Sequence, residues 1–74
     1  MEYDFSKLLG KIKEVFGKNS AFAKSMGLSE RTTSLKLNGK VGWKQKEIED
    51  ACQLLGIPRP EIVDYFFALK VHGL

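Results

Sequence analysis

The stretch of residues 19–39 most constrains how this chain can fold, because it holds two short helical patterns separated by only a few residues. In the first pattern, Phe22, Ala23 and Met26 form one apolar stripe at helical spacing. Gly27 follows, and a glycine just past a helix end readily adopts the positive φ that other residues disfavour. Two helices joined by so tight a turn are typical of a helix-turn-helix, whose second helix is free to enter a DNA groove.

The second helical pattern has its own start and stop signals. Leu28 supplies an apolar plug for the turn, and the Ser29 side chain can accept a hydrogen bond from a free backbone N–H of the next turn. A helix is therefore expected over residues 30–37. Asn38-Gly39 follows and predicts a left-handed exit from that helix.

These residues resemble those of the Cro-like and repressor-like phage helix-turn-helix regulators of the XRE superfamily. The shared pattern is Phe22-Ala23, then Met26-Gly27-Leu28-Ser29, then Asn38-Gly39, and the resemblance extends over residues 5–67. It implies a lambda-repressor-like, all-α domain of five short helices and a regulator of a phage or prophage switch that binds operator DNA. Thr33 departs from the pattern, because such proteins usually place a buried aliphatic residue there. We expect its hydroxyl to bond back to the preceding turn.

The length and composition limit the other possibilities. A chain of 74 residues predicts one domain over 1–74, with the helix-turn-helix at about 19–38. No apolar run approaches the length of a membrane span and no signal-peptide pattern is visible, so a soluble, cytoplasmic protein is expected. Cys52 and His72 are the only residues of their kinds, so we expect no intrachain disulfide, metal site or cofactor. With no catalytic constellation or phosphate loop either, we predict that the chain is not an enzyme and has no small-molecule substrate.

The net charge of +3 conceals an uneven distribution. Residues 1–46 contain ten Lys or Arg against four acids, giving +6, and residues 47–74 contain two against five, giving −3. A basic region around the helix at 30–37 is the electrostatic footprint of a polyanion binder. Charge alone fits equally well with a solvated, lysine-rich surface. The helix-turn-helix pattern is what favours double-stranded DNA as the partner.

Three further helices are expected from apolar periodicity. The first begins at Asp4 or Ser6 and ends at Phe16, with a predicted core stripe of Phe5, Leu8, Leu9, Ile12, Val15 and Phe16. The fourth begins near Lys44 and ends at Leu55, with Ile48, Ala51, Cys52 and Leu55 facing inward, and Trp43 before it is expected to anchor the core rather than stack on a base. The fifth is expected to begin at Pro60, with Ile62, Phe66 and Leu69 facing the core.

Candidate DNA contacts follow from side-chain direction on the helix at 30–37. Thr33 and Leu37 point inward, so the opposite face carries the residues expected to read base edges. These base-reading candidates are Ser29, Glu30, Arg31, Ser34 and Leu35. The candidates for phosphate contact are Lys18, Asn19, Ser20, Lys36, Asn38, Lys40 and Lys44.

Several of these residues also have a purely structural interpretation. Ser29 can be a helix cap, and Glu30 can stabilise a helix N-terminus through the helix dipole. Asn19 or Ser20 can cap the helix that they begin, since capping and phosphate binding use the same backbone groups. Leu35 suits a thymine methyl group or ordinary packing equally well.

The fifth helical pattern carries more apolar surface than one face can bury. Val63 and Phe67 are expected to point away from the core and to form a homodimer contact within residues 60–74. A two-fold dimer would set two DNA-reading helices about 34 Å apart, matching a palindromic operator. The tail at 68–74 could extend the helix, form a strand at the dimer contact or be disordered. A rival interpretation is a protein-interaction module, such as an antirepressor or an antitoxin, that binds its partner through this apolar helix.

Overall fold

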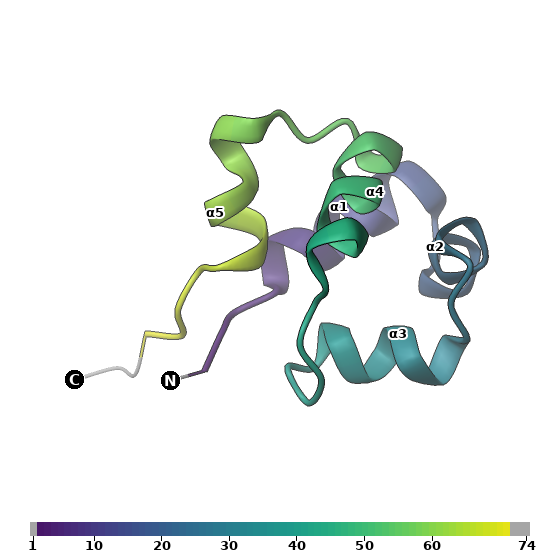
Figure 1. Cartoon of the computed structure of the whole chain (residues 1–74), viewed down its shortest axis with the longest axis horizontal. Coiled ribbons are helices and arrows are strands. Elements are labelled where there is room, and N and C mark those ends of the chain that lie inside the picture. The colour runs from purple at the N-terminus through teal and green to yellow at the C-terminus, as the bar shows by residue number, and fades with distance from the viewer. Residues whose placement is uncertain (1, 72–74) are drawn as a thin grey trace.

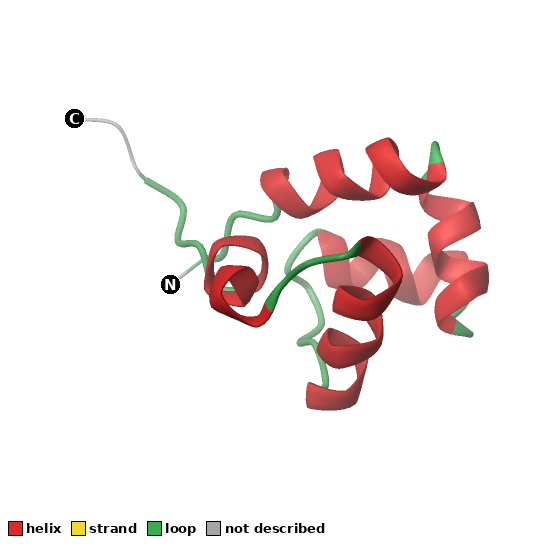
Figure 2. Cartoon of the chain, turned by 90° about the horizontal axis from the view of Figure 1, so that it is seen from above, coloured by secondary structure: helices red, strands yellow, loops and turns green. Residues whose placement is uncertain are grey.

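The computed structural model describes residues 2–71, and these fold into five short α-helices and one 3-10 turn (Figure 1). The helices are α1 (Ser6–Phe16), α2 (Asn19–Met26), α3 (Glu30–Leu37), α4 (Gln45–Leu55) and α5 (Ile62–Phe66), with the 3-10 turn at Arg59–Glu61. The predicted all-α class of five helices is confirmed. Figure 2 shows the same chain from above, with loops joining helices that cross one another at steep angles.

The turn between α2 and α3 forms as the sequence predicts. Gly27 has φ 73° and its N–H donates to the carbonyl oxygens of Ala23 and Lys24, which closes α2. The Ser29 hydroxyl accepts a hydrogen bond from the backbone N–H of Thr32 at 3.0 Å and so caps α3. A positive φ followed at once by a capped helix start lets the chain change direction within three residues.

The core lies between α1, α2, α4 and α5, with α3 packed beneath it. Leu8, Ile12 and Phe22 are fully buried, and the Phe22 ring packs edge-on against Phe16 with 5.7 Å between the centroids. Ala51 is also fully buried. The predicted inward face of α4 is confirmed, since Ala51, Cys52 and Leu55 are buried and Ile48 packs against them.

The predicted core stripe of α1 is too wide. Leu9 and Val15 are exposed, whereas Phe5, Leu8 and Ile12 are buried. At about 100° per residue, Leu9 and Val15 lie at opposite edges of the stripe, roughly 120° apart. The core covers the centre of the stripe and leaves both edges in solvent.

The C-terminal part of the prediction needs three corrections. Pro60 lies in the 3-10 turn, and the α-helix begins two residues later at Ile62 and ends at Phe66. Leu69 is 47% exposed and is not in a helix. It forms instead an isolated antiparallel bridge with Tyr3.

The tail turns away from α5 because its backbone pairs with the start of the chain. The N–H of Asp4 donates to the carbonyl oxygen of Ala68 at 2.7 Å, and the N–H of Lys70 donates to that of Glu2 at 3.0 Å. None of the three fates expected for 68–74 describes residues 68–70, which pair with the start of the same chain, and residues 72–74 lie outside the described residues. Among the helices of residues 2–71, none is long and apolar enough to cross a membrane.

Candidate nucleic-acid interface and adjoining groove

Helix α3 lies along one edge of the molecule, and its outer side is not covered by another helix (Figure 1). Its inner side packs on the core through Thr33 and Leu37, as the sequence predicts. The Thr33 hydroxyl, however, is buried and has no hydrogen-bond partner. The expected bond from this hydroxyl back to the preceding turn is therefore absent.

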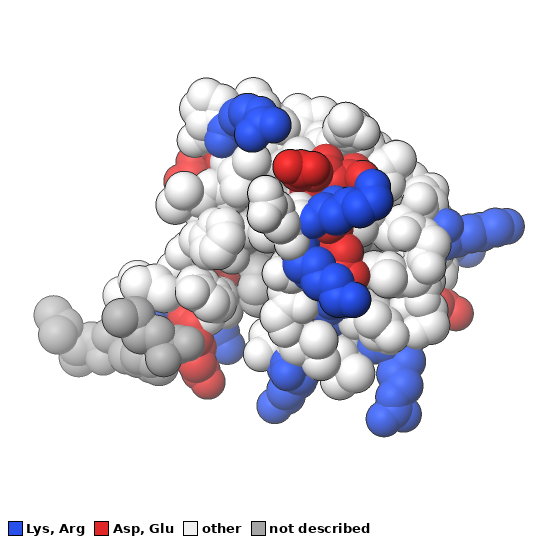
Figure 3. Space-filling view, in the orientation of Figure 1, with Lys and Arg blue, Asp and Glu red and all other residues white. Residues whose placement is uncertain are grey.

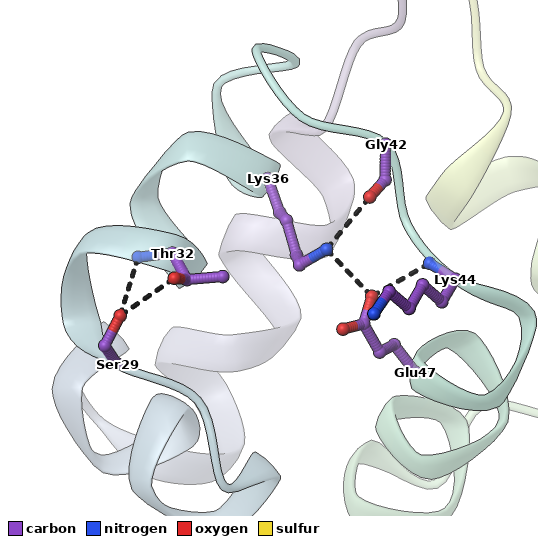
Figure 4. Close-up of polar contacts among 6 residues, drawn as sticks. All are labelled: Ser29, Thr32, Lys36, Gly42, Lys44 and Glu47. Carbon is purple, nitrogen blue, oxygen red and sulfur yellow. Dashed lines mark hydrogen bonds and ion pairs between the residues drawn. The ribbon is translucent and has the colours of Figure 1, made fainter.

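The base-reading candidates do share the outer face of α3. Ser29, Glu30, Arg31 and Ser34 are exposed, and Leu35 is half-buried. The Ser29 hydroxyl already bonds twice within the helix, because it also donates to the Thr32 hydroxyl at 2.9 Å (Figure 4). This supports the capping interpretation of Ser29.

The side chain of Asn38, the C-cap of α3, is hydrogen-bonded to Ser34. The Asn38 amide donates to the carbonyl oxygen of Ser34 at 2.9 Å and lies 3.3 Å from the Ser34 hydroxyl. This contact closes the last turn of α3. Any base contact by Ser34 would share its hydroxyl with Asn38.

The phosphate candidates at the start of α2 are accessible. Lys18 and Asn19 are exposed and Ser20 is half-buried. Lys18 and Ser20 line a shallow depression of about 510 Å³ that reaches Lys24 and Glu30. Helix α2 begins at Asn19 with Lys18 as its N-cap and no side-chain cap. The alternative interpretation of Asn19 or Ser20 as the cap of α2 is therefore wrong.

The phosphate candidates at the end of α3 divide into two groups. Asn38, Lys40 and Lys44 are exposed. Lys36 is only 3% exposed, so it is removed from the set. Its Nζ donates to the carbonyl oxygen of Gly42 and pairs with Glu47 Oε1, both at 2.9 Å (Figure 4).

The carboxylate that receives Lys36 is itself held in place. Glu47 Oε1 accepts a hydrogen bond from the backbone N–H of Lys44 at 2.8 Å. Burial raises the pKa of Glu47, but the Lys44 N–H and the Lys36 ammonium outweigh burial and hold this pKa below its usual value of 4.5. The Glu47 carboxylate therefore remains charged at neutral pH.

Pairing of Lys36 leaves little net charge on α3 itself. Glu30 and Arg31 carry opposite charges on its outer face, and the charge of Lys36 is compensated by Glu47. Figure 3 shows basic side chains projecting from the edge of the molecule formed by α3 and from the side formed by α2. The positive potential around α3 therefore comes mainly from residues beside the helix, such as Lys18, Lys24 and Lys40.

A second surface feature adjoins this edge, and we call it the aromatic groove. It is a groove of about 400 Å³ between the first residues of the chain, the loop at 38–43 and the end of α5. Five aromatic rings line it, from Tyr3, Phe5, Trp43, Phe66 and Phe67.

The rings of the aromatic groove pack edge-on in pairs. Tyr3 and Phe67 have centroids 6.0 Å apart, and Trp43 and Phe66 have centroids 5.2 Å apart. Trp43 is thus anchored on the core, as predicted, while it also faces the groove. Sequence reasoning singled out Phe67 alone among the exposed rings here, since Tyr3 comes into place only through the pairing of the two chain ends.

The comparisons with known proteins agree with this fold. A family described as "Protein of unknown function (DUF739)" matches residues 1–69. The chain belongs to this family. No functionally curated protein matches it.

This chain is also similar to a phage regulator of known structure. The chain is similar to the modulator of repression (MOR) of the temperate bacteriophage TP901-1 from Lactococcus lactis, known from its solution structure. The two share 56% sequence identity over 97% of each chain, with a TM-score of 0.81. This member of the DUF739 family is therefore a homologue of a phage regulatory protein and not an enzyme. The resemblance to phage regulators is confirmed at this level, and membership of the XRE superfamily stays a prediction.

The two residues predicted to form a dimer contact are exposed in this DUF739 protein. Val63 is 63% exposed and Phe67 is 44% exposed, one helical turn apart. Phe67 differs from Val63 because its ring also lines the aromatic groove. A homodimer through these residues stays a prediction.

Cys52 lies on α4 and its side chain is buried in the core. Burial raises the pKa of Cys52, since the charged thiolate is disfavoured away from water, although Arg59 nearby opposes the shift. A buried thiol with a raised pKa is an inert core residue rather than a nucleophile. Over residues 2–71, no group of three or more His, Cys, Asp or Glu is placed to hold a metal ion.

Proposed function

We propose that this protein modulates repression in a phage genetic switch by binding a DNA-binding repressor through the aromatic groove. The observation that carries this proposal is the groove itself, where the partly exposed rings of Tyr3 and Phe67 stand beside exposed Val41. Apolar patches of this kind on a small protein mark interaction sites. The name of the similar phage protein, a modulator of repression, supports a role in acting on repression.

The charge at the groove favours a partner segment that carries acidic residues. Lys40 and Lys70 stand at its edge, and Glu2 lies 3.8 Å from the Lys70 ammonium. Glu2 thus offsets one of the two lysines and leaves the charge of Lys40. An apolar or aromatic side chain flanked by acidic residues is the complement of this surface. Removing a half-exposed aromatic ring from water contributes about 1 kcal/mol to binding.

The distribution of charge on α3 favours binding of a protein partner over direct binding of DNA. A helix that reads DNA unaided gains affinity from cations on or beside it. The outer face of α3 has only Arg31 as an exposed cation, opposed by Glu30, and the other cations, such as Lys18, Lys24 and Lys40, lie beside the helix. The groove, in contrast, exposes apolar surface to solvent, which is unfavourable, and a bound partner would cover it. Contact with a repressor uses this surface directly.

The test is a repressor–operator titration followed by fluorescence anisotropy of the labelled operator. With the repressor of the same switch, the wild-type protein is expected to change the apparent operator affinity by about tenfold or more, equivalent to about 1.4 kcal/mol. Phe67→Lys should abolish this change. The matched control, Leu54→Lys, alters an exposed leucine on α4 outside the groove and should behave as wild type. A repressor that binds its operator equally with and without the wild-type protein would refute the proposal.

Direct, sequence-specific DNA binding is the second candidate, favoured by the exposed outer face of the helix-turn-helix. Arg31 would donate to guanine O6 and N7, and Leu35 would contact a thymine methyl group. The test is selection of bound sequences from a randomised duplex library with the protein alone. A pseudo-palindrome with half-sites one helical turn apart would support it. Arg31→Ala should then flatten the preference, and unchanged discrimination would remove Arg31 from the reading set.

The salt dependence of binding separates phosphate contact from base reading. If Lys18, Lys40 and Lys44 each neutralise one phosphate, the slope of log affinity against log salt is about −2.7 per chain. Replacing Lys40 and Lys44 by Ala should reduce the magnitude of the slope by about 1.8 and weaken all duplexes alike. An unaltered slope would show that neither lysine contacts phosphate.

A further inference from the structure

The most informative feature outside the two proposed surfaces is the buried ammonium of Lys36. This side chain leaves α3, a helix of the helix-turn-helix, and passes inward to the loop that follows it (Figure 4). An ammonium away from water is tolerated only when other groups replace its hydration. Here the carbonyl oxygen of Gly42 and the carboxylate of Glu47 do so, each at 2.9 Å.

Hydrogen bonds hold the loop at residues 38–44 at its start, at Gly42 and at Lys44. The N–H of Lys40 donates to the carbonyl oxygen of Leu35 at 2.9 Å, which fixes the start of the loop on α3. The carbonyl oxygen of Gly42 accepts from Lys36. The N–H of Lys44 donates to Glu47 at 2.8 Å, so the ion pair of Lys36 and Glu47 holds the last two places together.

This loop takes part in both proposed surfaces. Residues 38–43 form one wall of the aromatic groove, including the ring of Trp43. Lys40 and Lys44 are exposed beside α3, where the helix-turn-helix would meet DNA phosphates. The Lys36 ammonium lies 6.0 Å from the centroid of the Trp43 ring, between the two surfaces.

We infer that Lys36 is a positioning residue that couples the helix-turn-helix to the aromatic groove. Through its bonds to Gly42 and Glu47 it fixes the loop, and so the groove wall that contains Trp43. The functional consequence rests on the proposed function: a partner in the groove that shifts the loop also shifts Lys40 and Lys44. By linkage, contacts of these lysines with DNA would alter the groove by the same coupling free energy.

Trp43 allows a test that needs neither a repressor nor DNA. It is the only tryptophan of the chain, so its fluorescence reports on the groove wall alone. Lys36→Met keeps the length and apolar stem of the side chain but removes the ammonium. The acrylamide quenching constant of Trp43 is expected to rise at least about twofold in this variant, because the loop opens locally.

The matched control is Lys46→Met. Lys46 is an exposed lysine on the first turn of α4, and its ion pair with Asp50 is at the surface. This variant should leave the quenching of Trp43 unchanged. If Lys36→Met is folded by circular dichroism and has wild-type quenching, the inference is overturned.

A second measurement uses the wild-type chain and the Glu47→Gln variant, so the inference can be tested even if Lys36→Met does not fold. Hydrogen exchange should show the Lys44 amide protected, and Glu47→Gln should speed its exchange and increase the quenching of Trp43. Exchange of the wild-type Lys44 amide at the rate of an unprotected loop would overturn the inference. The outcome is independent of the repressor titration, because quenching can respond to Lys36→Met whether or not the wild-type protein acts on a repressor.

Discussion

Replacing Thr33 by valine should stabilise this protein, although the substitution removes a polar group from its helix-turn-helix. The Thr33 side chain is 1% exposed, and its hydroxyl has no hydrogen-bond partner. A buried polar group without a partner has lost its bonds to water and gained nothing in exchange. Valine has the same branched shape and the same restricted χ1, so Thr33→Val changes the hydroxyl and little else.

The expected size of the effect follows from the cost of the unpartnered hydroxyl. Leaving such a group unsatisfied costs about 1–3 kcal/mol, and we expect about 1–2 kcal/mol to be recovered when a methyl group takes its place. For a domain of this size each kcal/mol shifts the melting temperature by about 4–8 °C, so Thr33→Val should raise it by about 4–16 °C.

The neighbouring threonine provides the control. The Thr32 hydroxyl accepts a hydrogen bond from the Ser29 hydroxyl at 2.9 Å, so Thr32→Val removes a satisfied group from the same helix. It should lower the free energy of unfolding by about 0.5–1.5 kcal/mol. Both variants are compared with wild type by thermal and urea denaturation, followed by circular dichroism. A Thr33→Val variant that melts at or below the wild-type temperature would refute the reasoning.

Three other predictions test the turn, the ion pair and the exposed face of α5. Gly27→Ala should lower the free energy of unfolding by about 1–2 kcal/mol in a denaturant titration, because alanine disfavours φ 73°. Gly10→Ala inside α1 is the control and should raise it by about 0.8–1 kcal/mol. An added Cβ atom meets nothing within 4 Å at either position. Because the pKa of Glu47 is lowered in the folded state, its stabilising effect is present above about pH 4.5 and is lost as pH falls through the lowered pKa. Unfolding free energy should therefore fall less between about pH 5 and 3 in Glu47→Gln than in wild type, and equal slopes would contradict this role. If Val63 and Phe67 form a homodimer, sedimentation should show less association for Phe67→Lys, and equal association would exclude the contact.

Local signals predicted the helix-turn-helix well. Gly27, Ser29 and Gly39 act through backbone geometry within one or two residues, so their effects can be predicted without knowing the rest of the fold. The same is true of the apolar faces of α2 and α4. Helices α3 and α4 have the bounds, to within a residue, that periodicity and capping indicate.

The errors concern residues whose surroundings come from distant parts of the chain. The sequence predicts Lys36 as a phosphate contact, which requires exposure, and only the fold brings Glu47 and the Gly42 carbonyl to it. Leu69 was placed on a helix because the apolar pattern continues past Phe66. Pairing with the first residues of the chain ends that helix, and no local pattern reports such pairing.

The fate of Lys36 bears on how this helix-turn-helix can be used. A fold does not determine a function, which depends on the groups displayed at its surface. In this chain a lysine at the end of α3 is committed to holding the following loop, and that loop forms a wall of an aromatic groove. Pairing with Glu47 removes an exposed cation from the outer edge of α3, and the bond to Gly42 holds the loop that forms a wall of the neighbouring groove. A surface that must be recognised by a folded partner gains from such rigidity, because less conformational freedom is lost on binding. Under the proposed function, this rigidity favours the groove over α3 as the surface that a partner contacts first.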